Sequence, residues 1–142
     1  MTATPERALP EPGATASAEL VVSERDLASA FTPGPADAFP PVFATARMVA
    51  LMEVAAARLL QPFLAPGEHS VGVLVEVDHT AATPEGATVT ATARYVGREG
   101  RLHAFEVSAR DAGGEIGRGR HRRAVVTAER LVAGAHRRTA GA

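Results

Sequence analysis

The sequence contains no cysteine among its 142 residues. This absence excludes a disulfide framework, a thiol nucleophile and a thiolate metal site. The chain also has almost no net charge, because 15 lysine and arginine residues face 16 aspartate and glutamate residues. No global field therefore draws it to nucleic acid or to an anionic membrane, and an anionic ligand would need a local basic cluster.

Long apolar runs are also missing. No run approaches the roughly 18 residues that a membrane-spanning helix requires. The first residues, MTATPERALPEPGATASA, lack the basic and apolar blocks of a signal peptide. These features favour a cytoplasmic protein, and the length is typical of a single domain.

The two ends of the chain are poor in large apolar side chains. The N-terminal end is rich in proline, and the C-terminal end is small and polar. Such segments bury too little surface to offset the entropy cost of ordering. We predict a disordered leader over residues 1–17, a folded domain over 18–131 and a flexible tail over 132–142.

One long helix is predicted between Thr45, whose hydroxyl is a good N-cap, and the turn dipeptide Pro66-Gly67. Its apolar face is made of Met48, Leu51, Met52, Ala55, Ala56, Leu59, Leu60 and Phe63. Glu53 lies at the border of this face, roughly 100° from its centre. We consider two interpretations of Glu53, an exposed ion pair with a nearby arginine and a buried site.

Alternation of apolar and polar residues predicts strands over 70–78, 87–96, 101–110 and 115–128, with a short strand over 20–22. Short turns between the last four make consecutive strands antiparallel. A single helix long enough to cross the sheet would pack its apolar face on the concave side. The predicted fold class is therefore α+β, a hotdog fold with an antiparallel sheet around one central helix.

A loop rich in proline and glycine precedes the helix and ends in Phe39 and Phe43. Long loops in compact domains are commonly functional or disordered. We expect this loop to act as a lid over a pocket.

His79 ends the strand over 70–78 and opens the loop DHTAATPEG. An imidazole titrates near neutral pH and can serve as a base or an acid. The competing interpretation is a surface histidine bonded to Asp78 or Thr80. The histidines show no metal-binding spacing on a helix, so we expect no metal.

The only basic cluster lies in the last predicted strand, GRGRHRR. Alternation places Arg118, Arg120 and Arg122 on one side of the strand. We interpret these three arginines first as a charged solvent face and second as a phosphate-binding site. Arg123 points to the other side with the neighbouring glycines and His121. Arg123 is therefore the better candidate for contact with a ligand.

The segment FPPVFATARMVALMEVAAARLLQPFLAPGEHSVG, followed by VDHTAATPEG, closely resembles the fluoroacetyl-CoA thioesterase family of hotdog enzymes. The similarity extends through VSARDAGGEIGRGRHRRAVV and covers roughly residues 18–130. This resemblance implies a homodimer with active sites near the subunit interface. It also implies hydrolysis of small acyl-CoA thioesters without a metal or a cofactor.

By position, the resemblance assigns catalytic roles to Thr45, Glu53 and His79. Eight residues of helix separate Thr45 from Glu53, a rise of about 12 Å. The two side chains therefore cannot touch within one chain. His79, the substrate or the partner subunit must lie between them.

The resemblance also implies three substrate contacts. Phe39 matches a lid phenylalanine, Gly72 matches a glycine that lets the acyl group approach the backbone, and Arg123 matches an arginine near the substrate. The position of a second lid phenylalanine is occupied by Ala36, and the segment before Phe39 is about two residues shorter. We therefore expect a smaller or looser cap over the acyl group.

The predicted function is hydrolysis of short-chain acyl-CoA, including fluoroacetyl-CoA-like thioesters, to free acid and CoA. A hydratase or dehydratase acting on acyl thioesters, and a non-catalytic acyl-CoA binding protein, are the alternatives. Free CoA as a product indicates hydrolysis, whereas an altered acyl-CoA indicates hydration. The sequence leaves the preferred acyl group open, because one methylene changes selectivity by only about 1 to 3 kcal/mol.

Overall fold

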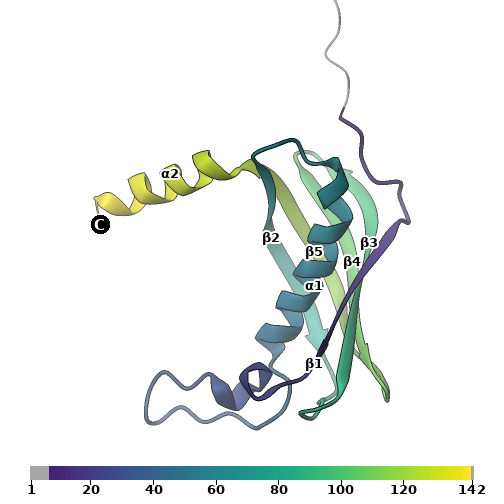
Figure 1. The fold of residues 1–142 in the computed structure, drawn as a ribbon, viewed down its shortest axis with the longest axis vertical. Helices are drawn as coiled ribbons and strands as arrows, with labels where there is room; N and C mark the ends of the chain where they lie inside the picture. The colour runs from purple at the N-terminus through teal and green to yellow at the C-terminus, as the bar shows by residue number, and fades with distance from the viewer. Residues whose placement is uncertain (1–6, 142) are drawn as a thin grey trace, which may run out of the picture.

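A curved antiparallel sheet wraps around one helix in the computed structural model, which describes residues 7–141 (Figure 1). The sheet has five strands in the order β1-β3-β4-β5-β2. Their bounds are β1 Thr15–Val21, β2 Glu68–His79, β3 Thr88–Glu99, β4 Leu102–Asp111 and β5 Gly114–Thr127. The helix inside the curve is α1, Thr45–Leu60. The predicted α+β architecture, with its antiparallel meander and central helix, is confirmed.

Helix α1 packs its predicted apolar face against the sheet. Its buried residues are Met48, Leu51, Met52, Ala55, Ala56, Leu59 and Leu60. Only Phe63 of the predicted face lies outside α1, in the 3-10 turn Gln61–Phe63. Two further 3-10 turns, Glu24–Asp26 and Ala28–Ala30, open the loop that leads to α1.

The predicted N-cap of α1 is wrong by one residue. Ala44 is the N-cap, with extended backbone, and its carbonyl accepts hydrogen bonds from the N–H groups of Arg47 and Met48. Thr45 is the first helical residue, and its hydroxyl makes no capping bond. The Thr45 side chain is instead bonded to a side chain of the sheet, described below.

Glycines in β5 allow the first half of α1 to approach the sheet. A Cβ at Gly117 would lie 2.7 Å from Met48 Sδ and 2.6 Å from the carbonyl oxygen of Asp78. Any larger residue there would push the helix and β2 away from β5. Because Gly117 pairs with His79 in the sheet, this close packing brings the start of α1 beside the end of β2.

Both predicted ends of the domain require correction. Strand β1 begins at Thr15, so ordered structure includes the last part of the predicted leader, 1–17. Its small residues bury little surface alone and are held by pairing with β3, a long-range contact that local composition does not reveal. Residues 1–6 of the leader lie outside the described residues.

The C-terminal segment is helical rather than irregular. Helix α2, Ala128–Ala140, continues from β5 and projects away from the sheet (Figure 1). It contains no buried residue. Within residues 7–141, neither α1 nor α2 combines the length and apolar character needed to cross a membrane.

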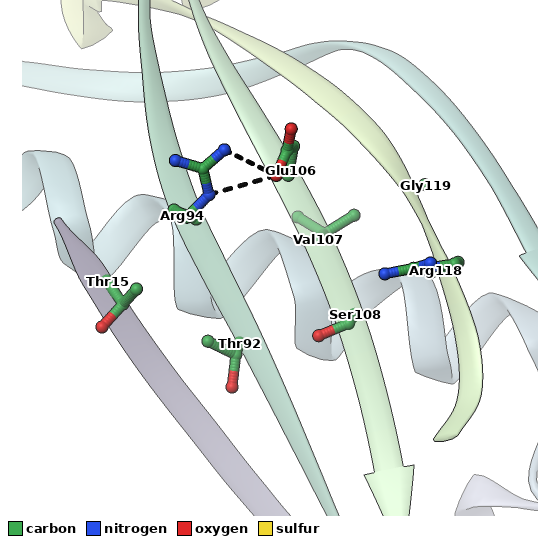
Figure 2. Close-up of a pocket in the computed structure, with 8 residues that line it drawn as sticks. All are labelled: Thr15, Thr92, Arg94, Glu106, Val107, Ser108, Arg118 and Gly119. Carbon is green, nitrogen blue, oxygen red and sulfur yellow. Dashed lines mark hydrogen bonds and ion pairs between the residues drawn. The ribbon is translucent and has the colours of Figure 1, made fainter. Parts of the chain in front are cut away.

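The face of the sheet opposite α1 is polar. Figure 2 shows a shallow pocket on this face, where Arg94 is paired with Glu106 at 2.8 Å and Arg118 lies on the neighbouring strand. Arg118, Arg120 and Arg122 are each paired with a glutamate. The predicted charged solvent face is therefore confirmed, and its arginines are neutralised by their neighbours.

Candidate active site

Thr45 and His79 meet where the start of α1 lies against the end of β2. The distance from Thr45 Oγ1 to His79 Nδ1 is 2.7 Å, a short hydrogen bond between residues 34 positions apart. The other ring nitrogen, Nε2, is shielded from solvent and has no hydrogen-bond partner among residues 7–141. The interpretation of His79 as a surface residue bonded to Asp78 or Thr80 is therefore wrong.

This pair is suited to proton transfer. An imidazole can take the proton of a hydroxyl that it holds at hydrogen-bond distance and return it later in the reaction. Thr45 also lies in the first turn of α1, where backbone N–H groups and the helix dipole favour a developing negative charge. The arrangement places a hydroxyl, an imidazole and a helix N-terminus together, which are the groups that acyl transfer requires.

A cavity of about 400 Å³ opens beside the pair, lined by Phe39, Pro40, Phe43, Thr45, His79 and Ala82, among others. A second, largely apolar cavity of about 250 Å³ shares Phe39 and Thr45 and is bordered by Phe31. Phe39 thus lies beside the pair, in the segment predicted to form a lid. Phe31 is a residue that the sequence reasoning missed, although an aromatic side chain in a loop rich in proline and glycine was its signal.

The base of the loop that precedes α1 is held by a buried carboxylate. Asp26 accepts hydrogen bonds from the backbone and hydroxyl of Ser23 and pairs with Arg47 at 2.8 Å. A bridge between Leu27 and Phe43 closes the loop. Burial alone would raise the pKa of Asp26, but the bonds from Ser23 and Arg47 lower it below its ordinary value. Asp26 therefore remains charged and fastens the loop to α1.

Glu53, Gly72 and Arg123 form a second group. Arg123 Nη1 lies 3.2 Å from Glu53 Oε1, and the arginine side chain is 7% exposed against 38% for the glutamate. A Cβ on Gly72 would overlap Glu53 Oε1, so the glycine leaves the space that the carboxylate occupies. Among residues 7–141, the nearby helix arginines have other partners: Arg47 pairs with Asp26, and Arg58 donates to the carbonyl of Ser17. The partner of Glu53 is Arg123 of β5.

Within one chain these two groups lie apart. About 12 Å of helix rise separates Thr45 from Glu53. Seven residues of β2 separate Gly72 from His79, on the order of 20 Å of strand. The structure therefore brings together Thr45, His79 and Phe39 at one end of β2, and places Glu53, Gly72 and Arg123 nearer the other.

Within residues 7–141, no group of three or more histidine and acidic side chains is arranged to hold a metal ion. The predicted absence of a cofactor stays a prediction. The chemistry available at Thr45 and His79 is proton transfer and nucleophilic attack.

Comparison with known proteins identifies the family. Residues 22–129 match the family model described as FlK, fluoroacetyl-CoA-specific thioesterase. A fluoroacetyl-CoA thioesterase from Streptantibioticus cattleyicolor is 50% identical over 101 residues, which cover 71% of this chain and 73% of that protein.

Solved structures agree with this match. A variant of the fluoroacetyl-CoA-specific thioesterase FlK in complex with fluoroacetate and CoA has a TM-score of 0.79 and 44% identity, covering 85% of this chain and 98% of that one. A thioesterase superfamily member from Thermus thermophilus has a TM-score of 0.81 and 31% identity, covering 93% and 94%. The hotdog fold is thereby confirmed, and the chain belongs to the fluoroacetyl-CoA-specific thioesterase family.

Proposed function

We propose that this chain hydrolyses short acyl-CoA thioesters, fluoroacetyl-CoA among them, with Thr45 and His79 as the reacting pair. Family membership makes it an acyl-CoA thioester hydrolase. The observation that carries the assignment to this pair is the 2.7 Å contact between Thr45 Oγ1 and His79 Nδ1 beside an open cavity.

The proposed reaction begins with the Thr45 hydroxyl donating to His79 Nδ1. This contact serves two routes: direct attack by Oγ1 on the thioester carbon, or attack by a water that both side chains hold. Backbone N–H groups of the first turn of α1 stabilise the oxyanion of the tetrahedral intermediate. His79 then gives its proton to the departing CoA sulfur. Direct attack by Oγ1 leaves an acyl ester on Thr45. A water then gives a proton to His79 and attacks the ester carbon, and His79 returns that proton to Oγ1 as the free acid leaves. Attack by water forms the free acid directly, with the proton of the water passing through His79 to the sulfur, and both routes balance without a cofactor.

The proposal includes a homodimer formed along β2. This strand is at the edge of the sheet, and its Val73 and Val75 are 54% and 42% exposed. An exposed apolar edge strand is suited to pairing with another strand. A second copy of β2, antiparallel to the first, would cover these valines and join the two sheets.

Such pairing would unite the two groups of site residues. With the two-fold axis between Val75 and Glu76, Gly72 of one subunit lies opposite His79 of the other, because each is the same number of residues from the axis. Both residues face α1, as their pairing with Arg123 and Gly117 indicates. Glu53, which contacts Gly72, would then approach the Thr45–His79 pair of the partner.

The unpartnered Nε2 of His79 supports this arrangement. When Nδ1 accepts from Thr45, the neutral ring carries its proton on Nε2. A buried N–H without an acceptor is costly, on the order of 1–3 kcal/mol. The partner subunit's Glu53 would accept that hydrogen bond and stabilise the imidazolium that forms during attack, as the carboxylate does in a Ser-His-Asp triad.

The acyl group would lie under the lid that carries Phe39. Phe39 borders both cavities next to Thr45, and its side chain is half exposed. Ala36, at the position of a second lid phenylalanine in the family pattern, leaves that cover smaller. We therefore propose that the substrates include thioesters whose acyl groups are somewhat larger than acetyl.

The test of this function is His79→Ala, assayed by release of free CoA from acetyl-, fluoroacetyl- and longer acyl-CoA. Turnover should fall by about 10²- to 10⁴-fold, the contribution of one general acid-base group. His136→Ala, a change on the exposed helix α2, is the matched control and should keep wild-type turnover. Undiminished CoA release by His79→Ala, or an altered acyl-CoA as the product of the wild type, would remove the proposal.

A further inference from the structure

A buried histidine that the proposed reaction does not use lies next to the Glu53–Arg123 pair. His121, on the α1 side of β5, is 1% exposed. Its Nδ1 lies 2.8 Å from the carbonyl oxygen of Leu74, and its Nε2 lies 3.1 Å from Arg123 Nη1. Both ring nitrogens therefore have partners, one in β2 and one in the site.

These two partners determine the tautomer of His121. A backbone carbonyl can only accept a hydrogen bond, so Nδ1 must carry the proton. A guanidinium can only donate, so Nε2 must be the unprotonated acceptor. His121 is therefore neutral, with its proton on Nδ1. A protonated ring would place two donors, and two positive charges, against each other.

Arg123 is thereby held in one orientation. Its Nε and Nη2 donate to the hydroxyl and the carbonyl of Ser70, at 2.9 and 2.8 Å. Nη1 has two hydrogens, and its two partners are His121 Nε2 and Glu53 Oε1. Because His121 accepts one of them, the other is directed at the carboxylate.

His121 also contacts an irregular part of the edge strand β2. The pairing of β2 with β5 shifts register between Gly72 and Leu74, which marks a bulge. His121 binds the carbonyl just beyond this bulge, and a Cβ at Gly72 would lie 3.3 Å from its Cε1. A chain of hydrogen bonds thus runs from the bulge through His121 and Arg123 to Glu53.

We infer that His121 is a positioning residue: it accepts from Arg123 Nη1, so that the guanidinium is aimed at Glu53 and the carboxylate is held against Gly72. This role rests on the proposed catalytic function of Glu53. His121 touches neither Thr45 nor His79 and takes no proton in the reaction.

Two substitutions separate this role from a purely structural one. In His121→Gln the amide oxygen can lie near the place of Nε2 and still accept from Arg123. In His121→Asn the amide nitrogen can lie near the place of Nδ1 and still donate to Leu74, but nothing accepts from Arg123. We expect His121→Asn to lower kcat about tenfold, which corresponds to about 1.4 kcal/mol of activation free energy. His121→Gln should remain within a few-fold of wild type, since roughly one hydrogen bond separates the two.

The matched control is His103→Gln. His103 is also buried, at 4% exposed, but its Nδ1 is bonded to Tyr95 at 2.9 Å. This variant should change the melting temperature while leaving kcat near wild type. Equal kcat values for His121→Gln and His121→Asn, or values that follow the melting temperatures of all three variants, would overturn the positioning role.

The tautomer of His121 and the turnover of Glu53→Gln provide two further tests. The 15N shifts of His121 in the wild-type protein should show a neutral ring protonated at Nδ1, whether or not the variants fold, and protonation at Nε2 would refute it. Glu53→Gln separates the two proposals. If Glu53→Gln keeps full turnover, the role of Glu53 fails; if it is inactive while His121→Asn is fully active, only the role of His121 fails.

Discussion

Gly72→Ala perturbs the site by a single methyl group. An ideal Cβ at this position overlaps Glu53 Oε1, whereas the nearest atom of any other residue's side chain, His121 Cε1, is 3.3 Å away. Gly72 lies outside the positive-φ region, so its backbone tolerates alanine. The Glu53 carboxylate is the end of a flexible side chain that is 38% exposed, and it can move into solvent. The methyl group should therefore expel the carboxylate and leave the sheet in place.

The expected cost to stability is small. The substitution breaks the hydrogen bond from Arg123 Nη1 to Glu53 Oε1, at 3.2 Å. A hydrogen bond to a charged group contributes about 1.5–3 kcal/mol, which partial exposure of Glu53 reduces to about 1 kcal/mol. Arg123 keeps both bonds to Ser70. A decrease of about 1 kcal/mol lowers the melting temperature by about 3 to 5 °C in a domain of this size.

The expected cost to activity is much larger. If Glu53 stabilises the imidazolium of His79 during attack, its displacement should reduce kcat by about 10²-fold or more. The assay is CoA release by wild type, Gly72→Ala, Glu53→Gln and the double variant, with melting temperatures measured in parallel. If the methyl group acts only by displacing Glu53, the double variant should be no slower than Glu53→Gln. Full activity of Gly72→Ala beside an inactive Glu53→Gln, or effects that multiply in the double variant, would refute this reasoning.

Two further predictions concern the dimer and the lid. Subunit exchange between the inactive variants Glu53→Gln and His79→Ala should restore CoA release that neither variant has alone. One site of each mixed dimer then combines an intact carboxylate with an intact histidine. No recovery in mixed dimers isolated by affinity tags would contradict a shared site. Asp26→Asn should lower the free energy of unfolding by about 1–2 kcal/mol at pH 7, because the substitution removes the charge that the buried Asp26 carboxylate presents to the half-exposed Arg47. Since the folded pKa of Asp26 lies below its ordinary value of 3.8, the stabilisation is complete above that pH and disappears as the pH falls below it. Denaturant titrations at pH 7 and pH 3 should therefore show a difference between wild type and Asp26→Asn that shrinks at the lower pH, and a constant difference would contradict this assignment.

Local periodicity was sufficient to predict the parts of the fold whose residues are close in sequence. The apolar face of α1 and four of the strands followed from spacings of 3.6 and 2 residues. The same alternation placed Arg123 on the face opposite Arg122. In contrast, β1 was predicted too short, because its small residues carry little signal and depend on pairing with β3. Helix α2 was missed because it buries no apolar face.

The sequence by itself determined which residues share a face and, through the motifs around Thr45, Glu53 and His79, which family this chain belongs to. Only the tertiary structure decided which of these side chains meet. Thr45 reaches His79 across 34 residues because glycine at position 117 lets α1 lie close to the sheet. Glu53 meets Arg123 across 70 residues because Gly72 leaves space for a carboxylate. The spacing of residues along a chain specifies which face of a helix or strand each side chain is on. Contact between distant segments depends instead on strand register and on how closely helix and sheet can pack.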